Sequence, residues 1–148
     1  MSKIRYMKKI FLITLTSLFL VSCSKNDVNN ENCKFLLNIG VNTNINLNLP
    51  QYSQLLFISN SVYVPNFGNK GIIVTNSGTG FIAWDAADPN HSQQSCSIVN
   101  GTGLEGTCGC TDANTYSFIT GQSLGVALPC TLKRYRVEQS GNTLFISN

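Results

Sequence analysis

The sequence predicts an all-β fold, and three observations support this expectation. Apolar residues or Thr alternate with Asn from Val41 to Leu49, which is the period of a strand with one buried face. Several further short runs are rich in β-branched and aromatic residues and are separated by turn sequences. No window of about a dozen residues has the apolar spacing of a helix. Together these features indicate an antiparallel β-sandwich or small barrel.

The expected strands follow one another in a simple order. The first two are Val41 to Leu49 and Leu55 to Val64, each closed by a Pro. Two more, Gly71 to Thr75 and Phe81 to Trp84, are joined by a polar turn. A long region rich in Gly, Ser, Asn and Cys separates these from the last expected strands, which are Tyr116 to Ile119, Leu132 to Glu138 and Thr143 to Ser147.

The N-terminus has the pattern of a secretory signal. Four basic residues (Lys3, Arg5, Lys8 and Lys9) precede the charge-free stretch from Ile10 to Val21. A transmembrane helix needs about 20 apolar residues, so this stretch is too short to span a bilayer. A basic segment followed by a short apolar one is typical of a signal peptide.

The signal ends in Leu20-Val21-Ser22-Cys23, which resembles the lipobox of bacterial lipoproteins. The alternative is a plain signal peptide that ends near a Cys. The resemblance implies that Cys23 becomes an acylated first residue, which anchors the chain to membrane lipid in the cell envelope, on the periplasmic side or at the outer-membrane surface. We therefore expect a signal peptide over residues 1–22, a lipidated, polar and Asn-rich tether over 23–32, and a single domain over 33–148.

Charge and motifs argue against several functions. Without the leader the chain has six basic and seven acidic residues, so its net charge is −1 and nothing indicates binding of nucleic acid. The spacing of Gly101, Gly103 and Gly106 matches a dinucleotide fingerprint, but no helix is expected after it, so we expect a turn and no nucleotide cofactor. No nucleophile elbow accompanies the single histidine, His91, so no catalytic residue is predicted.

The cysteines carry the most specific information. Five remain after Cys23, and disulfides are permitted in an exported chain. The odd count leaves at least one thiol unpaired, bound to metal or linked to another molecule.

The cysteine region has two short motifs, Asp88-Pro89-Asn90-His91 followed by Cys96, and Cys108-Gly109-Cys110-Thr111. A Thr-Gly turn and the strand sequence Leu132-Lys133-Arg134-Tyr135 follow them. This order resembles the Rieske iron–sulfur fold, in particular small Rieske-like lipoproteins of the Bacteroidetes. The resemblance extends roughly from Leu47 to the C-terminus, and it implies two loops that face each other across a cluster site.

The resemblance assigns a place to each residue of the two motifs. Ligand places fall on Asp88, where the family has Cys, on His91 and Cys108, which keep the expected residue types, and on Thr111, where the family has His. It also implies that Cys96 and Cys110 form a disulfide between the loops. Asp88 and Thr111 are therefore lost ligand positions, and His91 and Cys108 are the residual ones.

A count of histidines limits the chemistry. A Rieske centre needs two His and two Cys, and this chain has one His. A set of His91, Cys96, Cys108 and Cys110 would be an altered site for [2Fe–2S] or Zn²⁺. If Cys96 and Cys110 form the disulfide, only His91 and Cys108 remain, which is too few for a cluster.

The function that we expect is a non-catalytic binding or structural module with a degenerate [2Fe–2S] site and no cofactor. Its partners would be membrane lipid, through Cys23, and an unidentified protein. The alternative is an electron-transfer protein, either a carrier or an oxidoreductase subunit, that binds [2Fe–2S] or Zn²⁺ through altered ligands. Cys33 and Cys130 are the remaining cysteine pair, and a second disulfide between them is one possibility, because the sequence does not fix their separation.

Overall fold

The computed structural model describes residues 33–148, so the expected signal peptide, the lipidation site at Cys23 and the tether lie outside the described residues. The described part consists of two antiparallel sheets and one short 3-10 helix. Within residues 33–148 no helix is long and apolar enough to cross a membrane. The elements are β1 (Asn42–Asn46), η2 (Pro50–Leu56), β2 (Ser61–Val64), β3 (Ile72–Asn76), β4 (Phe81–Asp85), β5 (Val99–Asn100), β6 (Glu105–Cys108), β7 (Thr115–Ser117), β8 (Ser123–Leu124), β9 (Arg134–Ser140) and β10 (Thr143–Ser147).

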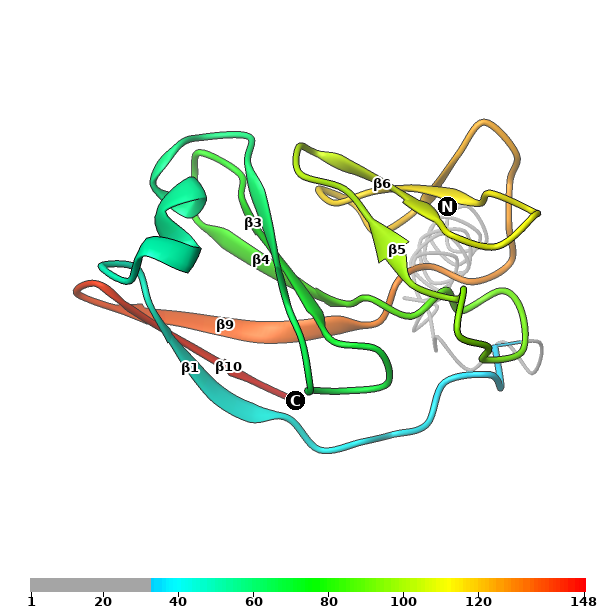
Figure 1. Ribbon diagram of the computed structural model, residues 1–148, viewed down its shortest axis with the longest axis horizontal. Coiled ribbons are helices and arrows are strands. Elements are labelled where there is room, and N and C mark those ends of the chain that lie inside the picture. The colour runs from blue at the N-terminus through cyan, green and yellow to red at the C-terminus, as the bar shows by residue number, and fades with distance from the viewer. Residues whose placement is uncertain (1–32) are drawn as a thin grey trace, which may run out of the picture.

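The larger sheet has six strands in the order β1-β10-β9-β4-β3-β2 and curves as a half-barrel. Its two halves are joined where Ala83 and Trp84 of β4 pair with Tyr135 and Arg134 of β9. The smaller sheet has the order β5-β6-β7-β8. In Figure 1 its strands β5 and β6 lie to the right of β3 and above β9. All strand pairs are antiparallel, so the all-β expectation is confirmed.

Two hydrophobic clusters lie on opposite faces of β3 and β4. Ile72, Val74 and Ala83 belong to a cluster that fills the half-barrel. Ile73 and Trp84 point the other way, into a cluster shared with the smaller sheet. Because neighbouring side chains of a strand point to opposite faces, these two strands are buried on both sides. The second cluster positions the smaller sheet, and with it both loops that carry the cysteine motifs.

Several expected strands match the structure closely. The expected strand from Thr143 to Ser147 coincides with β10, and the hairpin of β3 and β4 turns at the expected polar residues. The expected strand from Leu55 to Val64 is wrong in its first half. Pro50 begins the 3-10 helix η2, as its fixed φ allows, and Leu55 lies in that helix. Ser59, with a φ of 67°, then breaks the extended backbone before β2 begins.

The region between Asp85 and Thr115 is less irregular than expected, because β5 and β6 lie within it. Gly101 and Gly103 of the glycine motif lie in the turn between these two strands, and Gly106 lies in β6. A Cβ atom at Gly101 would collide with the Glu105 carbonyl oxygen, and one at Gly106 would collide with the Phe118 ring. Close approach therefore requires glycine at both positions.

Candidate functional site

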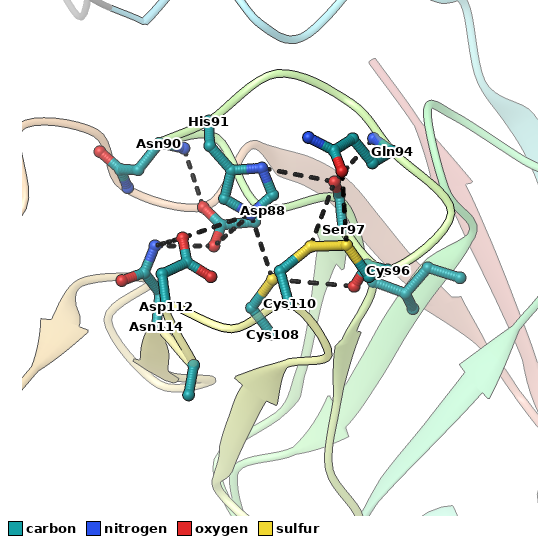
Figure 2. Close-up of polar contacts among 12 residues, drawn as sticks. Asp88, Asn90, His91, Gln94, Cys96, Ser97, Cys108, Cys110, Asp112 and Asn114 are labelled. Carbon is teal, nitrogen blue, oxygen red and sulfur yellow. Dashed lines mark hydrogen bonds and ion pairs between the residues drawn. A yellow bond between two sulfur atoms is a disulfide. The ribbon is translucent and has the colours of Figure 1, made fainter.

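Two loops carry the candidate site. The first, residues 86–98, connects β4 to β5, and the second, residues 109–114, connects β6 to β7. A disulfide between Cys96 and Cys110 joins them, with a Cα–Cα distance of 4.9 Å. Figure 2 shows the polar side chains that gather beside this disulfide. The structure thus contains the inter-loop pair that the resemblance implies.

Asp88 lies at the centre of the site and has no solvent-exposed surface. Its Oδ1 atom accepts hydrogen bonds from the Tyr116 hydroxyl (2.6 Å) and from the Asn90 backbone N–H (2.8 Å). Its Oδ2 atom accepts one from the Asn114 side-chain amide (3.0 Å). A buried carboxylate is costly unless its oxygens are hydrogen-bonded, and here three donors supply those bonds.

His91 is held so that one ring nitrogen faces the interior of the site. Its Nδ1 atom lies 2.9 Å from the Ser92 carbonyl oxygen, which fixes the orientation of the ring. Its Nε2 atom lies 3.3 Å from Cys108 Sγ, 3.4 Å from Asp88 Oδ2 and 3.5 Å from Asp112 Oδ2. His91 is thus in contact with residues of both loops and with one thiol and two carboxylates (Figure 2).

Cys108 ends β6 and is the free cysteine of residues 33–148. Its thiol is buried, with 3% of the residue exposed. Burial, aided by the negative charge of Asp88, raises its pKa from 9.0 to about 11. At neutral pH Cys108 is therefore a protonated thiol in the absence of a metal. Its environment is unlike that of a reactive cysteine, which is exposed and has a lowered pKa.

Asp112 and Asn114 belong to the site although the sequence did not single them out. The Asn114 amide nitrogen donates to Asp112 Oδ2 (2.9 Å) as well as to Asp88. Loop two brings both residues back over His91 through a turn in which Ala113 has a φ of 47°. Thr111, the position where the resemblance places a lost His ligand, is exposed. The only sequence signal for Asp112 was a carboxylate four residues after a candidate ligand cysteine.

A second layer of contacts fixes loop one from outside. Asn90 donates from its side chain to the Tyr116 hydroxyl and to the Cys130 carbonyl oxygen, both at 2.8 Å. The Cys130 N–H donates back to the Asn90 side-chain oxygen (3.0 Å). Cys130 in turn forms a disulfide with Cys33, so the structure also contains the second cysteine pair considered from the sequence. The start of the domain is thereby linked to the site.

A similar buried carboxylate lies at the base of loop one. Asp85, the last residue of β4, accepts a hydrogen bond from the Tyr135 hydroxyl (2.6 Å) and two from Asn69, both at 2.8 Å. It also caps the loop by accepting from the Ala87 N–H (3.0 Å). Asp85 has no exposed surface and faces none of the potential metal ligands of the site. It is a structural carboxylate, and it provides a comparison for Asp88.

The donor set does not fit a [2Fe–2S] cluster. Such a cluster is held by four donors, two on each iron, and Rieske centres use two His and two Cys. Cys96 and Cys110 bond to each other, so of the His and Cys residues in the two motifs only His91 and Cys108 are left. The other groups within reach are carboxylates, and hard oxygen donors match a sulfide cluster poorly.

Comparison with known proteins gives a partial likeness of fold. No protein-family model and no curated protein matches the sequence. Among solved structures, the ferredoxin of carbazole 1,9a-dioxygenase from Nocardioides aromaticivorans IC177 is 16% identical, with a TM-score of 0.43 over 73% of this chain and 96% of its own. A protein assigned as the small subunit of an NADPH nitrite reductase is 21% identical, with a TM-score of 0.41 over 70% and 97%. Both likenesses are at low identity, and they do not bear on the chemistry of the site.

Proposed function

We propose that this chain is a lipid-anchored envelope protein whose Rieske-like domain acts as a non-catalytic binding or structural module. The observation that carries the proposal is the Cys96–Cys110 disulfide. It occupies two of the four thiols and imidazoles in the motifs, and the remaining pair, His91 and Cys108, is too small a set for [2Fe–2S]. Electron transfer through an ordinary Rieske centre therefore lacks its ligands here.

The arrangement of the buried polar groups supports a module that acts without catalysis. Asp88 has its oxygens engaged by Tyr116, Asn90 and Asn114. Cys108, the one free thiol in residues 33–148, is buried and protonated at neutral pH. A catalytic group needs access to substrate and a pKa suited to its task, and neither residue meets both needs.

The central experiment is reconstitution of the purified chain with iron and sulfide under anaerobic conditions. We expect no stable visible absorption and no stoichiometric acid-labile sulfide, while a genuine Rieske ferredoxin treated in parallel takes up its cluster. A cluster that forms in stoichiometric amount and is lost in a His91→Ala variant would overturn the proposal in favour of an electron carrier with altered ligands.

The anchoring part of the proposal rests on the lipobox-like sequence that ends at Cys23. Two or more acyl chains hold a protein stably on a membrane, whereas one does not. We expect the intact chain to fractionate with membranes and a Cys23→Ser variant to be released or left unprocessed. Unchanged membrane association of that variant, with mass spectrometry showing no acylated cysteine in the parent, would contradict lipid anchoring at Cys23.

A further inference from the structure

The gathering of unlike donor atoms around His91 Nε2 is not explained by loss of the cluster. This one nitrogen lies within 3.5 Å of a thiol sulfur and of two carboxylate oxygens, those of Cys108, Asp88 and Asp112. A ring nitrogen carries at most one hydrogen, so it cannot donate to both carboxylates and also accept from the thiol. A single cation placed between the four groups would satisfy all of them at once.

We propose that the two loops hold one zinc ion through Asp88, His91, Cys108 and Asp112. The inference rests on the proposed absence of an iron–sulfur cluster, since both groups would need His91 and Cys108. The ligand atoms are Asp88 Oδ2, His91 Nε2, Cys108 Sγ and Asp112 Oδ2. On binding, the Cys108 thiol gives its proton to solvent and coordinates as thiolate, and the Cys96–Cys110 disulfide stays intact.

The distances from His91 Nε2 to the other three ligand atoms fit a tetrahedral zinc site. With zinc bonds of about 2.0–2.2 Å to nitrogen and oxygen and about 2.3 Å to sulfur, neighbouring ligand atoms lie about 3.3–3.6 Å apart. The three measured distances from His91 Nε2 are 3.3, 3.4 and 3.5 Å. The donor atoms of His91, Cys108 and Asp112 all lie within 4.8 Å of one another. Three of the six distances between the proposed ligand atoms therefore already match a tetrahedral zinc site.

The surrounding hydrogen bonds are those expected of metal ligands. The N–H group of the other ring nitrogen of a ligating histidine usually donates a hydrogen bond to a carbonyl or carboxylate. His91 Nδ1 lies 2.9 Å from the Ser92 carbonyl oxygen. Ligating carboxylates are in turn hydrogen-bonded, and the Asn114 amide contacts Oδ2 of both Asp88 and Asp112. Each of these oxygens has a second lone pair available for the metal.

The donor types select the metal. Thiolate and imidazole favour zinc over calcium or magnesium, which take oxygen ligands alone. Asp112 has 39% of its side chain exposed, which provides a path from solvent. Cys108 and Asp88 are buried beneath it. The ion would thus enter past Asp112 and settle on His91 and the two buried ligands.

The test is metal binding by the full-length chain with both disulfides intact, using Zn²⁺ and, as a spectroscopic probe, Co²⁺. We expect one equivalent of Zn²⁺ to bind. Co²⁺ should give a thiolate-to-cobalt charge-transfer band and the intense visible bands of a tetrahedral site. Both should disappear when Zn²⁺ displaces Co²⁺. Peptide mapping of the loaded protein should still show Cys96 joined to Cys110.

Variants distinguish zinc binding at the proposed site from nonspecific zinc binding elsewhere on the protein. Asp112→Ala is the most informative, because Asp112 is exposed and its loss should leave the fold intact. It should weaken zinc binding more than Asn114→Ala, which removes the supporting hydrogen bonds to Asp88 and Asp112 and should cost about 10- to 100-fold. Cys108→Ser should abolish the charge-transfer band. Glu105→Gln, an exposed acid on β6, should bind as the parent does.

The outcomes are distinguishable from those of cluster reconstitution. Absence of binding by Zn²⁺ and Co²⁺, or equal affinity in the parent and Asp112→Ala, would overturn the zinc site and leave the proposed function standing. Zinc binding only after reduction of Cys96–Cys110 would also overturn it, because the ligands would then be the cysteines of both loops. Uptake of [2Fe–2S] would instead overturn the proposed function.

Discussion

The hydrogen bond between Tyr116 and Asp88 should be the most costly single polar contact to remove from the site. Tyr116→Phe deletes a hydroxyl that donates to Asp88 Oδ1 at 2.6 Å and accepts from the Asn90 amide at 2.8 Å. A bond to a charged group contributes about 1.5–3 kcal/mol and a neutral one about 0.5–1.5 kcal/mol. The substitution should therefore lower the free energy of unfolding by about 2–4 kcal/mol, a large share of a typical total of about 5–15 kcal/mol.

The assay is equilibrium unfolding in urea with the disulfides intact, followed by the fluorescence of Trp84. This is the only tryptophan of the chain, and it is buried with its indole N–H bonded to the Phe118 carbonyl oxygen (2.7 Å). Its emission therefore reports opening of the core beneath the two loops. The midpoint should fall while the slope with urea stays constant, as expected when stability alone changes.

Two matched variants complete this experiment. Tyr63→Phe removes an exposed hydroxyl that donates to the Lys70 carbonyl oxygen (2.8 Å) and should cost less than about 0.5 kcal/mol. In an Asp88→Asn background, Tyr116→Phe should cost less than in the parent, because the charged acceptor is gone. A loss for Tyr116→Phe no larger than for Tyr63→Phe would refute the description of Asp88 as a buried carboxylate held by donors.

The remaining predictions concern the thiols and the response to pH. The Cys108 thiol, with its pKa raised to about 11, should react slowly with iodoacetamide at neutral pH in metal-free native protein and at an ordinary rate in urea; equal rates would contradict its burial. Replacing Cys96 and Cys110 together by Ser should lower the free energy of unfolding by about 3 kcal/mol, because the disulfide closes a loop over a separation of 14 residues. An unchanged urea midpoint would show that this disulfide does not stabilise the two loops. The free energy of unfolding should fall as pH rises above about 9, because folding raises the pKa of Cys108, Tyr116 and Tyr135, and the folded chain keeps protons that the unfolded chain loses. Urea unfolding from about pH 8 to about pH 10.5 measures this, and the decrease should be smaller in Tyr135→Phe.

The sequence predicts the larger sheet well where burial sets a clear pattern. Apolar runs bounded by turn residues give β3, β4 and β10 nearly to the residue. It misses β5 and β6 because strands of two and four residues that contain Asn, Gly and Thr carry no periodic signal. Val99 of β5 and Cys108 of β6 pack in one cluster with Phe118 and Trp84, which lie outside both strands.

The candidate site is only half visible in the sequence. Cysteine and histidine are rare enough to be noticed, so His91 and Cys108 stand out with the two disulfide cysteines. Asp112 and Asn114 are residue types that are common in any polar loop, and only the turn of loop two brings them over His91. Distances between loops depend on tertiary structure, so the four-residue donor set could not be derived from spacing alone.

Asp88, which stands where the resemblance places a ligand cysteine, helps to hold the two loops together. In a site of the Rieske type the cluster itself would link loop one to loop two. Here Asp88 links them by hydrogen bonds to Tyr116 and Asn114, and the Cys96–Cys110 disulfide links them covalently. In loops held in this way, His91 Nε2 lies 3.3 Å from Cys108 Sγ. The hydrogen bonds and the disulfide thus place His91 and Cys108 where both could bind a single ion. Zinc binding and reconstitution with iron and sulfide test whether these two residues bind zinc or an iron–sulfur cluster.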